Sequence, residues 1–456
     1  MSEDTNSKNL EPVLPIEKIL QPFNDFIRIE SSGGIVLILS TILALVWANS
    51  PWGGLYESFK NMTVTIGAGD FVLSKPAVLW INDGLMAIFF FLVGLEIKRE
   101  VLVGELNSLK HAMLPIFAAV GGMVAPALFY ALFNHGTSSA GGWGIPMATD
   151  IAFSLGILSL LGKRAPLSLK IFLTAVAIVD DIGAILVIAI FYSSGISLYL
   201  IGFAIFLLVV MFVMNKLGVR SPIPYVILGG LMWLAFLKSG IHATVAGVLA
   251  AMAIPARSEI CCNNFLVSAR DSLGEYEMSG GSGDTVLSNK RMLSALGDLH
   301  NTVLLASPPL KRIEHNLHYW VAFGIMPIFA LANAGIDFTP DNGTAINLFH
   351  PVSFGIICGL ILGKVVGICL ASFIAVKSGA AEMPSGMVPG HFFGASLLAG
   401  IGFTMSIFIT TLAWDDSSEF IATAKLSILL ASAIAGLAGF LVLRTCRLSV
   451  GCSIDN

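Results

Sequence analysis

The stretch "AIVDDIGAIL" (residues 177–186) places two aspartates next to each other in the middle of an apolar run. Placing one charged side chain at the centre of a bilayer costs about 2.5–3.5 kcal/mol on insertion scales. Neighbouring positions of a helix point about 100° apart, so Asp180 and Asp181 need a wide polar cavity rather than a single partner. Helix packing alone would not require two carboxylates, so the pair predicts a functional site.

The composition around this stretch is that of an integral membrane protein. Of the 456 residues, 56% are hydrophobic and only 12% are charged. A helix needs about 17–25 largely apolar residues to cross a bilayer. The sequence therefore predicts an all-α polytopic membrane protein with twelve transmembrane helices. They lie near residues 33–49, 79–97, 112–133, 142–161, 168–191, 197–215, 223–238, 240–256, 319–338, 351–376, 391–413 and 423–443.

Three hydrophilic segments complete this organisation: an N-terminal tail (1–32), a loop (257–318) between helices 1–8 (33–256) and helices 9–12 (319–443), and a C-terminal tail (444–456). The loop carries six basic and seven acidic residues and the run "SGGSGD". This composition favours a flexible connection over a folded domain.

Two shorter elements are predicted at the membrane surfaces. The run "TVTIGAGDFVL" (63–73) has two β-prone halves around a Gly-rich turn, which indicates a small hairpin. The run "IEKILQPFNDFIRI" (16–29) has the pattern of a short amphipathic helix, although Pro22 weakens it.

The basic residues predict the orientation. Of the 25 lysines and arginines, 20 fall on the side of the two termini and only Lys60, Lys75, Lys238 and Lys425 on the other. The remaining one, Lys364, lies in the middle of a span. Basic loops stay in the cytoplasm, so both termini are expected there. No basic stretch leads into a short apolar core before the first helix, so no removable signal peptide is expected. The six cysteines have neither disulfide nor zinc spacing.

The fourth predicted helix contains a break. In "GWGIPMATDIAF" (142–153), Pro146 removes a backbone donor in mid-span, and Thr149 and Asp150 follow where freed backbone groups need partners. A plain proline kink is the alternative, but it does not explain the buried Asp150.

The eleventh helix has a matching feature in "LAGIGFTMSIF" (398–408), where Gly400 and Gly402 precede Thr404. Glycines also serve close helix packing, so they are weak evidence alone. Seven spans separate the fourth helix from the eleventh, so the two run in opposite directions. Paired interruptions in inverted halves indicate the binding site of a transporter.

Lys364, in "LILGKVVGICL" (360–370), is the one basic residue in the middle of a predicted span. Its ammonium needs a carboxylate, a helix C-terminus or water, because unpaired burial would neutralise it. It could reach the membrane surface only if it lay near a helix end, and about a dozen residues flank it on each side.

These groups predict a reaction class. Carboxylate, hydroxyl and carbonyl oxygens suit a small hard cation, and the same carboxylates bind protons when the cation leaves. If the site faces one side of the membrane at a time, competition between the two ions couples their movements. This predicts a secondary transporter, not an enzyme, with no cofactor.

Several motifs together resemble the NhaA family of bacterial sodium/proton antiporters, in the same order from about residue 30 to 440. This family is itself among those from which the rule on inverted halves was drawn. The motifs are "INDGLMAIFFFLVGLEIKRE" (81–100), "MATDIAF" (147–153), "AIVDDIGAI" (177–185), "SGIHATVAG" (239–247), "PIFALANAGI" (327–336) and "GIGFTMSIF" (400–408).

The resemblance implies the NhaA fold, with inverted repeats and two broken helices that cross at mid-membrane. It implies an electrogenic, pH-regulated antiporter of the inner membrane, which exports Na⁺ or Li⁺ in exchange for H⁺ by alternating access and serves sodium and pH homeostasis. It also implies a homodimer in which the outside hairpin near 62–75 makes contacts, and no nucleic-acid partner.

Carried over residue by residue, the resemblance implies that Asp180 and Asp181 bind the cation and the protons. It places Thr149 near the cation, Asp150 at the positive ends of the half-helices, and Lys364 in a pair with Asp180.

The resemblance further implies a pH-sensing cluster near the cytoplasmic face, where composition alone indicates an ordinary charged border. Its members are Glu96, Arg99, Glu100, Glu314, His315 and His318. Two residues on the outside, Asp83 and His242, are secondary candidates. The 257–318 loop is longer than the family's usual connection at this place, and it adjoins the cluster. The pH response is therefore the expectation that this departure from the family affects most.

Three alternatives fit less well. A sodium-coupled symporter for an organic solute would need further recognition groups, such as a buried arginine, and no arginine lies mid-span. An intramembrane aspartyl protease would carry Gly-x-Gly-Asp, but "MAT" precedes Asp150 and "AIV" precedes Asp180. A receptor would not need Lys364 opposite three buried acids. Phosphate-binding and nucleic-acid motifs are absent from the sequence.

Overall fold

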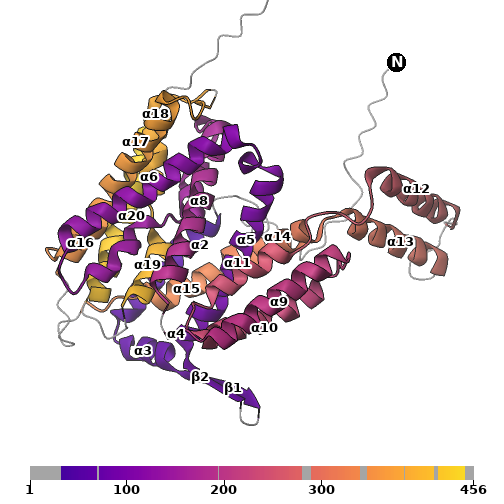
Figure 1. Cartoon of the computed structure of the whole chain (residues 1–456), viewed down its shortest axis with the longest axis horizontal. Helices are drawn as coiled ribbons and strands as arrows, with labels where there is room; N and C mark the ends of the chain where they lie inside the picture. The colour runs from indigo at the N-terminus through magenta and orange to yellow at the C-terminus, as the bar shows by residue number, and fades with distance from the viewer. Residues whose placement is uncertain are drawn as a thin grey trace, which may run out of the picture.

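The computed structural model describes residues 32–68, 71–193, 195–279, 289–338, 347–384, 386–414 and 420–446. Within these ranges the chain is a bundle of helices with one small β-hairpin (Figure 1). The surface helix expected at 16–29, most of the C-terminal tail and most of "SGGSGD" lie outside the described residues.

Every predicted span coincides with one helix or with consecutive helices. In chain order they are α2 (Ser32–Ala48); α4 (Ala77–Trp80), η1 (Ile81–Leu85) and α5 (Met86–Val103); α6 (Leu109–Asn134); η3 (Ala140–Met147) and α7 (Ile151–Leu160); α8 (Leu167–Phe191); α9 (Leu198–Lys216); α10 (Pro222–Ser239); α11 (Thr244–Ala253); α14 (Pro309–Trp320), η5 (Val321–Ile325) and α15 (Met326–Asn333); α16 (Pro351–Cys358), η7 (Gly359–Gly363) and α17 (Lys364–Lys377); α18 (Pro389–Ala399) and α19 (Phe403–Ala413); and α20 (Phe420–Thr445).

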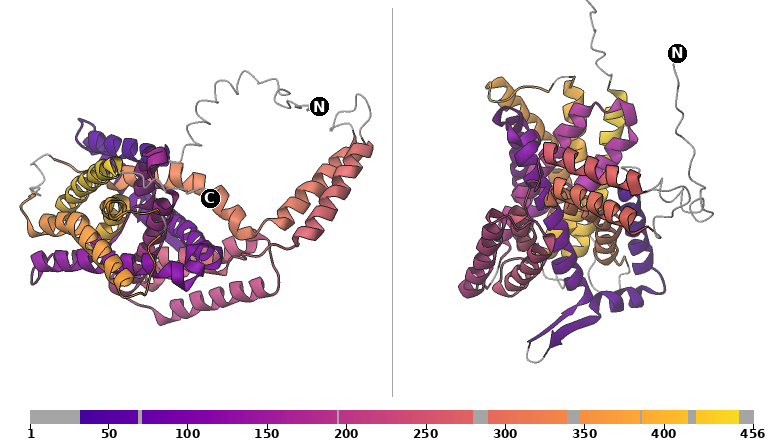
Figure 2. Two further views of the ribbon diagram at one scale, coloured as in Figure 1. Left: turned by 90° about the horizontal axis from the view of Figure 1, so that it is seen from above. Right: turned by 90° about the vertical axis from the view of Figure 1, so that its right-hand side faces the viewer.

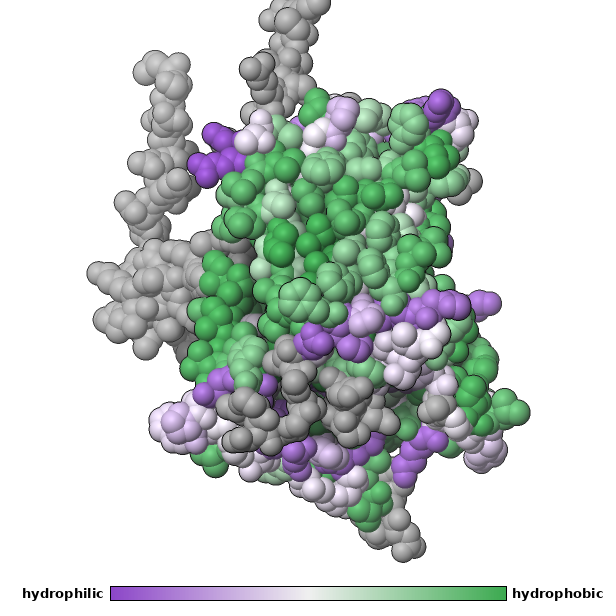
Figure 3. All heavy atoms as spheres, turned by 90° about the vertical axis from the view of Figure 1, so that its left-hand side faces the viewer, coloured by the Kyte–Doolittle hydropathy of each residue, from purple (hydrophilic) through white to green (hydrophobic). Residues whose placement is uncertain are grey.

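Length and apolar composition alone identify eight of these as membrane-crossing among the described residues, or ten if two bent pairs each count once. One bent pair is α18 and α19, with 43° between them. The other is α2 and α3 (Gly53–Asn61), which turn by 112°. Figure 3 shows a broad hydrophobic face with hydrophilic residues above and below it, as expected of a surface that contacts lipid.

The two discontinuous helices break at short extended or turn segments. In the fourth span the break covers residues 148–150, and Pro146 lies in the 3₁₀-helical half before it. The predicted break is confirmed, with Thr149 and Asp150 in the open segment, while a 3₁₀ segment accommodates Pro146 just before it. In the eleventh span the break covers residues 400–402, as the two glycines predicted.

Small residues allow the closest helix contacts. Gly121 of α6 and Gly367 of α17 face each other so closely that a Cβ on either would meet the other's backbone. This contact fixes the start of α17, which is Lys364. In the same way Gly94 of α5 lies against α11, where an added Cβ would be 2.7 Å from the Cβ of Ala251. Lipid gives no hydrophobic drive between helices, so such close packing holds them together.

The 257–318 loop differs from its prediction. It contains α12 (Cys262–Ser279) and α13 (Lys290–Ala306), which pack along each other, and α14 begins at Pro309. Charged residues at the exposed positions masked a helical pattern of apolar ones. Figures 1 and 2 show this helical hairpin extending away from the bundle. Its two ends are adjacent, since Leu310 N donates to Pro255 O at 3.1 Å.

The predicted β-hairpin is confirmed. β1 (Thr63–Ala68) pairs antiparallel with β2 (Phe71–Pro76), with Thr63 opposite Pro76. In Figure 1 it lies at the end of the bundle away from α18. We call this end the β-hairpin face and the opposite end, with the start of α18, the basic face.

Candidate functional site

The two broken helices cross in opposite directions at their breaks. Asp150 N donates to Ile401 O at 2.7 Å. On one side of this bond Ser154 Oγ donates to Leu398 O at 2.9 Å, and on the other Ser406 Oγ donates to Ile145 O at 2.7 Å. As residue numbers rise along one helix they fall along the other, so the spans are antiparallel and tied backbone to backbone.

Asp150 fills the centre of this crossing and is 1% exposed. Its Oδ1 accepts from Phe153 N at 3.0 Å, which caps α7. Its Oδ2 accepts from Thr404 N at 3.2 Å and from the Thr404 hydroxyl. The carboxylate thus lies at the N-terminal ends of both α7 and α19, where helix dipoles favour negative charge.

Asp180, Lys364 and Thr149 form a second buried group. Lys364 Nζ pairs with Asp180 Oδ2, and neither side chain is exposed. Lys364 Nζ also donates to Thr149 Oγ1 at 3.0 Å. Thr149 Oγ1 lies 2.6 Å from Asp180 Oδ2 and 2.8 Å from Ala399 O, so its single proton can go to one of them at a time. Ala399 ends α18, so its carbonyl is one that the break frees.

Asp181 is next to this group, but among the described residues it has no partner. Both of its carboxylate oxygens are buried without a hydrogen bond from them, as is Oδ1 of Asp180. Asp181, Thr149 and Asp150 line the closed end of a cavity of about 880 Å³. An unpaired buried carboxylate is costly, and a proton or a cation from the cavity would relieve that cost.

The cavity extends from Asp181 toward the basic face. Along α8 its wall carries Ile178, Thr174 and Lys170, which lie at successive turns of one helix face. Acidic side chains outnumber basic ones on its lining, which raises the local concentration of cations.

Five of the six predicted pH-sensing residues line this cavity together. Arg99 Nη2 lies 2.8 Å from Glu100 Oε1, and Arg99 also pairs with Glu314, whose second oxygen is buried without a partner. Glu96 and His318 line the same wall. His315 does not: it is exposed and stacks edge-on against Tyr319 at 5.7 Å, because it lies a quarter turn of α14 away from Glu314.

The secondary residues Asp83 and His242 meet near the β-hairpin face. Lys75 of β2 donates to Asp83 Oδ2 at 2.7 Å, and His242 Nε2 lies 3.8 Å from Asp83 Oδ1. The His242 ring also contacts the ring of Phe408, at 5.4 Å between centroids. Phe408 packs against Phe90 as well, at 5.7 Å.

The chain was compared with known proteins. A family described as Na⁺/H⁺ antiporter 1 matches residues 24–443. A protein named Na⁺/H⁺ antiporter NhaA from Oleidesulfovibrio alaskensis is 54% identical over 94% of this chain and 95% of its own. Proteins of the same name from Sulfurimonas denitrificans (46%; 94% and 96%) and Koribacter versatilis (47%; 97% and 95%) are similar over comparable spans. The chain belongs to the NhaA family of Na⁺/H⁺ antiporters.

As a member of the NhaA family, this protein is a secondary transporter in a membrane, not an enzyme. Its relatives imply the twelve-helix fold. Two of the twelve spans, α11 and the α14–α15 run, are not long or apolar enough to be identified as membrane-crossing by those two criteria alone. They correspond to the eighth and ninth predicted helices.

Two residues of this NhaA site were not predicted. Thr404 supplies two of the three hydrogen bonds to Asp150, yet only its place after the paired glycines pointed to it. Thr174 lines the cavity two turns from Asp181, and a lone threonine in an apolar helix gave no signal. Thr404 becomes visible only when segments far apart in sequence are brought together, and Thr174 only when the helices that enclose the cavity are in place.

Proposed function

We propose that Asp180 and Asp181 form the site at which Na⁺ or Li⁺ competes with H⁺, with Thr149 nearby as a hydroxyl ligand. The observation that carries this proposal is the unpaired Asp181 carboxylate at the closed end of the cavity, beside the buried Lys364–Asp180 pair. A cation reaching Asp181 finds carboxylate, hydroxyl and freed carbonyl oxygens, which are suitable ligands for a hard ion.

The exchange is electrogenic in this proposal. In the proton-loaded state Lys364 is charged and paired with Asp180, and Asp181 holds a proton. A cation that binds both carboxylates displaces the Asp181 proton, and Lys364, now without its partner, releases a second one. Two protons thus leave for each monovalent cation that binds, so one net charge moves per cycle.

Alternating access is supported by the asymmetry of the molecule. The cavity reaches Asp181 from the basic face, whereas the packed rings of Phe90, Phe329 and Phe408 lie between the crossing and the β-hairpin face. All three phenylalanines are fully buried. In our proposal the crossing moves relative to these rings, so that the site opens on one side only as it closes on the other.

We further propose that the charges around Arg99 regulate this exchange with pH. Arg99 pairs with both Glu100 and Glu314, and Glu96 and His318 lie on the same wall. A change in protonation of any member would change this pairing and the charge of the route to Asp181. Glu314→Gln is expected to shift the pH of half-maximal exchange without changing the maximal rate, and Glu57→Gln, on the far surface, serves as the control.

The basic face is cytoplasmic in this proposal, with both termini there, since most lysines and arginines belong to it. The protein then lies in the inner membrane and exports Na⁺. The β1–β2 sheet has only these two strands among the described residues, and a two-stranded sheet alone is marginally stable. We therefore assign the β-hairpin to a homodimer contact.

The test is sodium-induced proton movement in everted vesicles across a pH series, with wild type beside Asp181→Asn. Wild type is expected to collapse a pH gradient when Na⁺ or Li⁺ is added, and the variant to be inactive although present in the membrane in equal amount. If wild type moves no protons with either cation at any pH, antiport is wrong and sodium-coupled uptake of organic solutes becomes the function to test.

A further inference from the structure

The helical hairpin α12–α13 has one apolar side that the bundle does not cover. Its inner seam contains Ser272 of α12 and Ala295 of α13, both buried. At about 100° per residue, Leu273 and Leu296 lie close to a quarter turn from that seam. Because the two helices are antiparallel, this quarter turn brings both leucines to the same side of the hairpin.

Four large apolar side chains share this side and are well exposed. They are Leu266 (54%), Leu273 (50%), Leu296 (39%) and Val303 (48%). The opposite side of the hairpin is more polar, with Asp271 and Glu275 on α12 and Arg291 and Asp298 on α13. It also exposes Val267 (60%) and Met278 (83%), but these lie among charged side chains and have no counterpart at the middle of α13. The continuous apolar surface is on the first side, and such a surface indicates a contact with another molecule.

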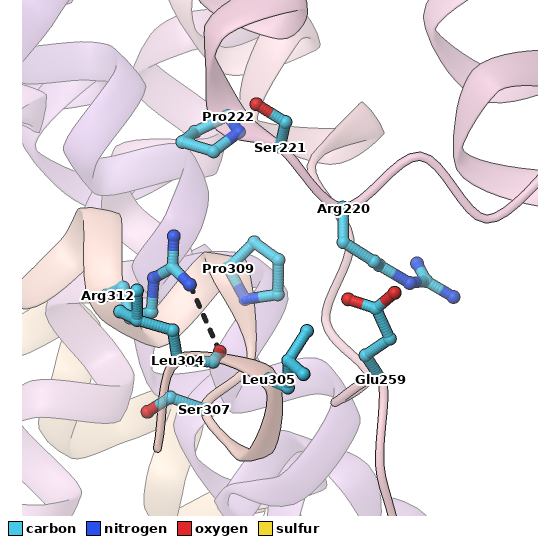
Figure 4. Close-up of a pocket in the computed structure, with 9 residues that line it drawn as sticks. All are labelled: Arg220, Ser221, Pro222, Glu259, Leu304, Leu305, Ser307, Pro309 and Arg312. Atoms are coloured by element: carbon cyan, nitrogen blue, oxygen red, sulfur yellow. Dashed lines mark hydrogen bonds between the residues drawn. The ribbon is translucent and has the colours of Figure 1, made fainter. Parts of the chain in front are cut away.

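Among the described residues, the hairpin meets the bundle near its base and not elsewhere. Glu259 N donates to Leu305 O at 2.9 Å there. A pocket of about 250 Å³ lies at the same place. At this pocket Arg312 donates to Leu304 O at 3.1 Å, and Arg220 and Glu259 extend from separate segments (Figure 4). Beyond this base the helices extend away from the bundle (Figure 2), so its own helices leave the apolar side open.

Charge decides between a lipid surface and a protein surface. Residues 262–306 carry five acidic and three basic side chains. Anionic lipid attracts basic segments, so this hairpin lacks the charge of a lipid-binding element. Arg270 lies three residues before Leu273, and Glu277 lies three residues after Gly274. Both border the apolar side. A two-fold axis between positions 273 and 274 therefore brings each Arg270 next to Glu277 of a second copy.

We propose that the α12–α13 hairpins of two copies pack apolar side to apolar side about this axis and form a four-helix bundle outside the membrane. The contact is isologous, as a two-fold axis requires, and buries the four exposed apolar side chains on each copy. It goes beyond the transport function and adds a second interface to the homodimer proposed through β1 and β2.

Disulfide cross-linking of the full-length protein in membranes tests this contact. In a cysteine-free background, Leu273→Cys is expected to give a covalent dimer on mild oxidation, because position 273 lies beside the axis. The matched control is Glu275→Cys, exposed on the polar side of the same helix, which is expected to stay monomeric. Equal cross-linking at both positions would mean random collision and would overturn the proposal.

A charge exchange gives an independent test of the same axis. Arg270→Glu or Glu277→Arg alone is expected to lower the cross-linked fraction of Leu273→Cys by about two- to fivefold, as exposed ion pairs allow. The double variant is expected to restore it, which a general loss of structure would not do. Failure of the double variant to recover would exclude this register.

A third variant separates this proposal from the dimer contact at β1–β2. Val72→Cys in β2 reports on that sheet, and sodium-induced proton movement reports on transport. Cross-linking at Val72→Cys but not at Leu273→Cys would reject the four-helix bundle and leave both other proposals standing. A spin label at position 273 that oxygen reaches but a water-soluble nickel chelate does not would show that lipid covers this side instead.

Discussion

Asp150 and Asp181 are both buried carboxylates near the middle of the same bundle, and each is 1% exposed. Their surroundings differ in one respect: Asp150 accepts three hydrogen bonds, whereas no residue that the structure describes donates to either oxygen of Asp181. The first carboxylate is held by two helix ends that its own charge stabilises. Both carboxylates line the same cavity, but only the second is left there without a hydrogen bond from the described residues, so a proton or a cation can become its partner.

The difference teaches that burial alone does not identify a binding residue. A fully paired carboxylate such as Asp150 contributes to stability and to the local field, and its pairing would have to be broken before it could bind an ion. An unpaired one next to open space is destabilising until a proton or a cation arrives. Four experiments test this distinction through the free energy of unfolding of substituted proteins, measured by thermal unfolding in detergent.

The largest effect is expected at the Lys364–Asp180 pair, because neither side chain is exposed. Lys364→Met leaves Asp180 buried without its cation and is expected to cost about 3–5 kcal/mol of stability. Adding Asp180→Asn removes the stranded charge and is expected to recover most of that loss. A double variant as unstable as Lys364→Met alone would show that packing, not charge, explains the loss.

A direct comparison of the two carboxylates comes next. Asp150→Ala strands Phe153 N and both donors of Thr404, and is expected to cost about 2–3 kcal/mol. Asp181→Ala strands no donor, so the midpoint of unfolding is expected to stay the same or rise. Equal destabilisation by both variants would contradict the distinction drawn between them.

Removing one donor at the crossing should have a smaller effect. Thr404→Val keeps the volume of the side chain but removes the hydroxyl that donates to Asp150, and is expected to cost about 1.5–2 kcal/mol. Thr404→Ser keeps the hydroxyl and serves as the control. If Thr404→Ser loses as much as Thr404→Val, the methyl group rather than the hydrogen bond is responsible.

The smallest effect is expected for a carboxylate that is neither buried nor alone. Glu57 pairs with Lys60 at 3.1 Å on exposed α3, and 57% of its side chain is accessible. Glu57→Gln is expected to change stability by less than about 0.5 kcal/mol, because water screens this pair. A larger change would mean that unfolding in detergent reports on general charge rather than on individual pairings.

Much of the membrane architecture could be predicted from the sequence, because spans and buried charges follow from the cost of placing polar groups in lipid. The β-hairpin was likewise predicted from its local pattern of β-prone residues and glycine. The fourth-helix break was also predicted, since Thr149 and Asp150 lie in the open segment 148–150, but the 3₁₀ turn that accommodates Pro146 before it was not.

What the sequence could not give depends on contacts between distant segments. Thr404 reaches Asp150 across more than 250 residues, and no local pattern encodes that distance. The orientation of His315 away from the cavity depends on how α14 is rotated against its neighbours. The helices α12 and α13 were missed because their exposed charges and the glycine-rich run between them have the composition of a linker.

The hydrogen bond from Leu310 N to Pro255 O has a consequence for how this chain can change over time. It holds the last residues after α11 and the first residues of α14 together, so everything between them enters and leaves at nearly one point. A segment with adjacent ends can be lengthened, shortened or replaced without displacing the helices on either side. The α12–α13 hairpin is therefore a removable module, whereas one added residue in either break would shift every bond that joins the two crossing helices.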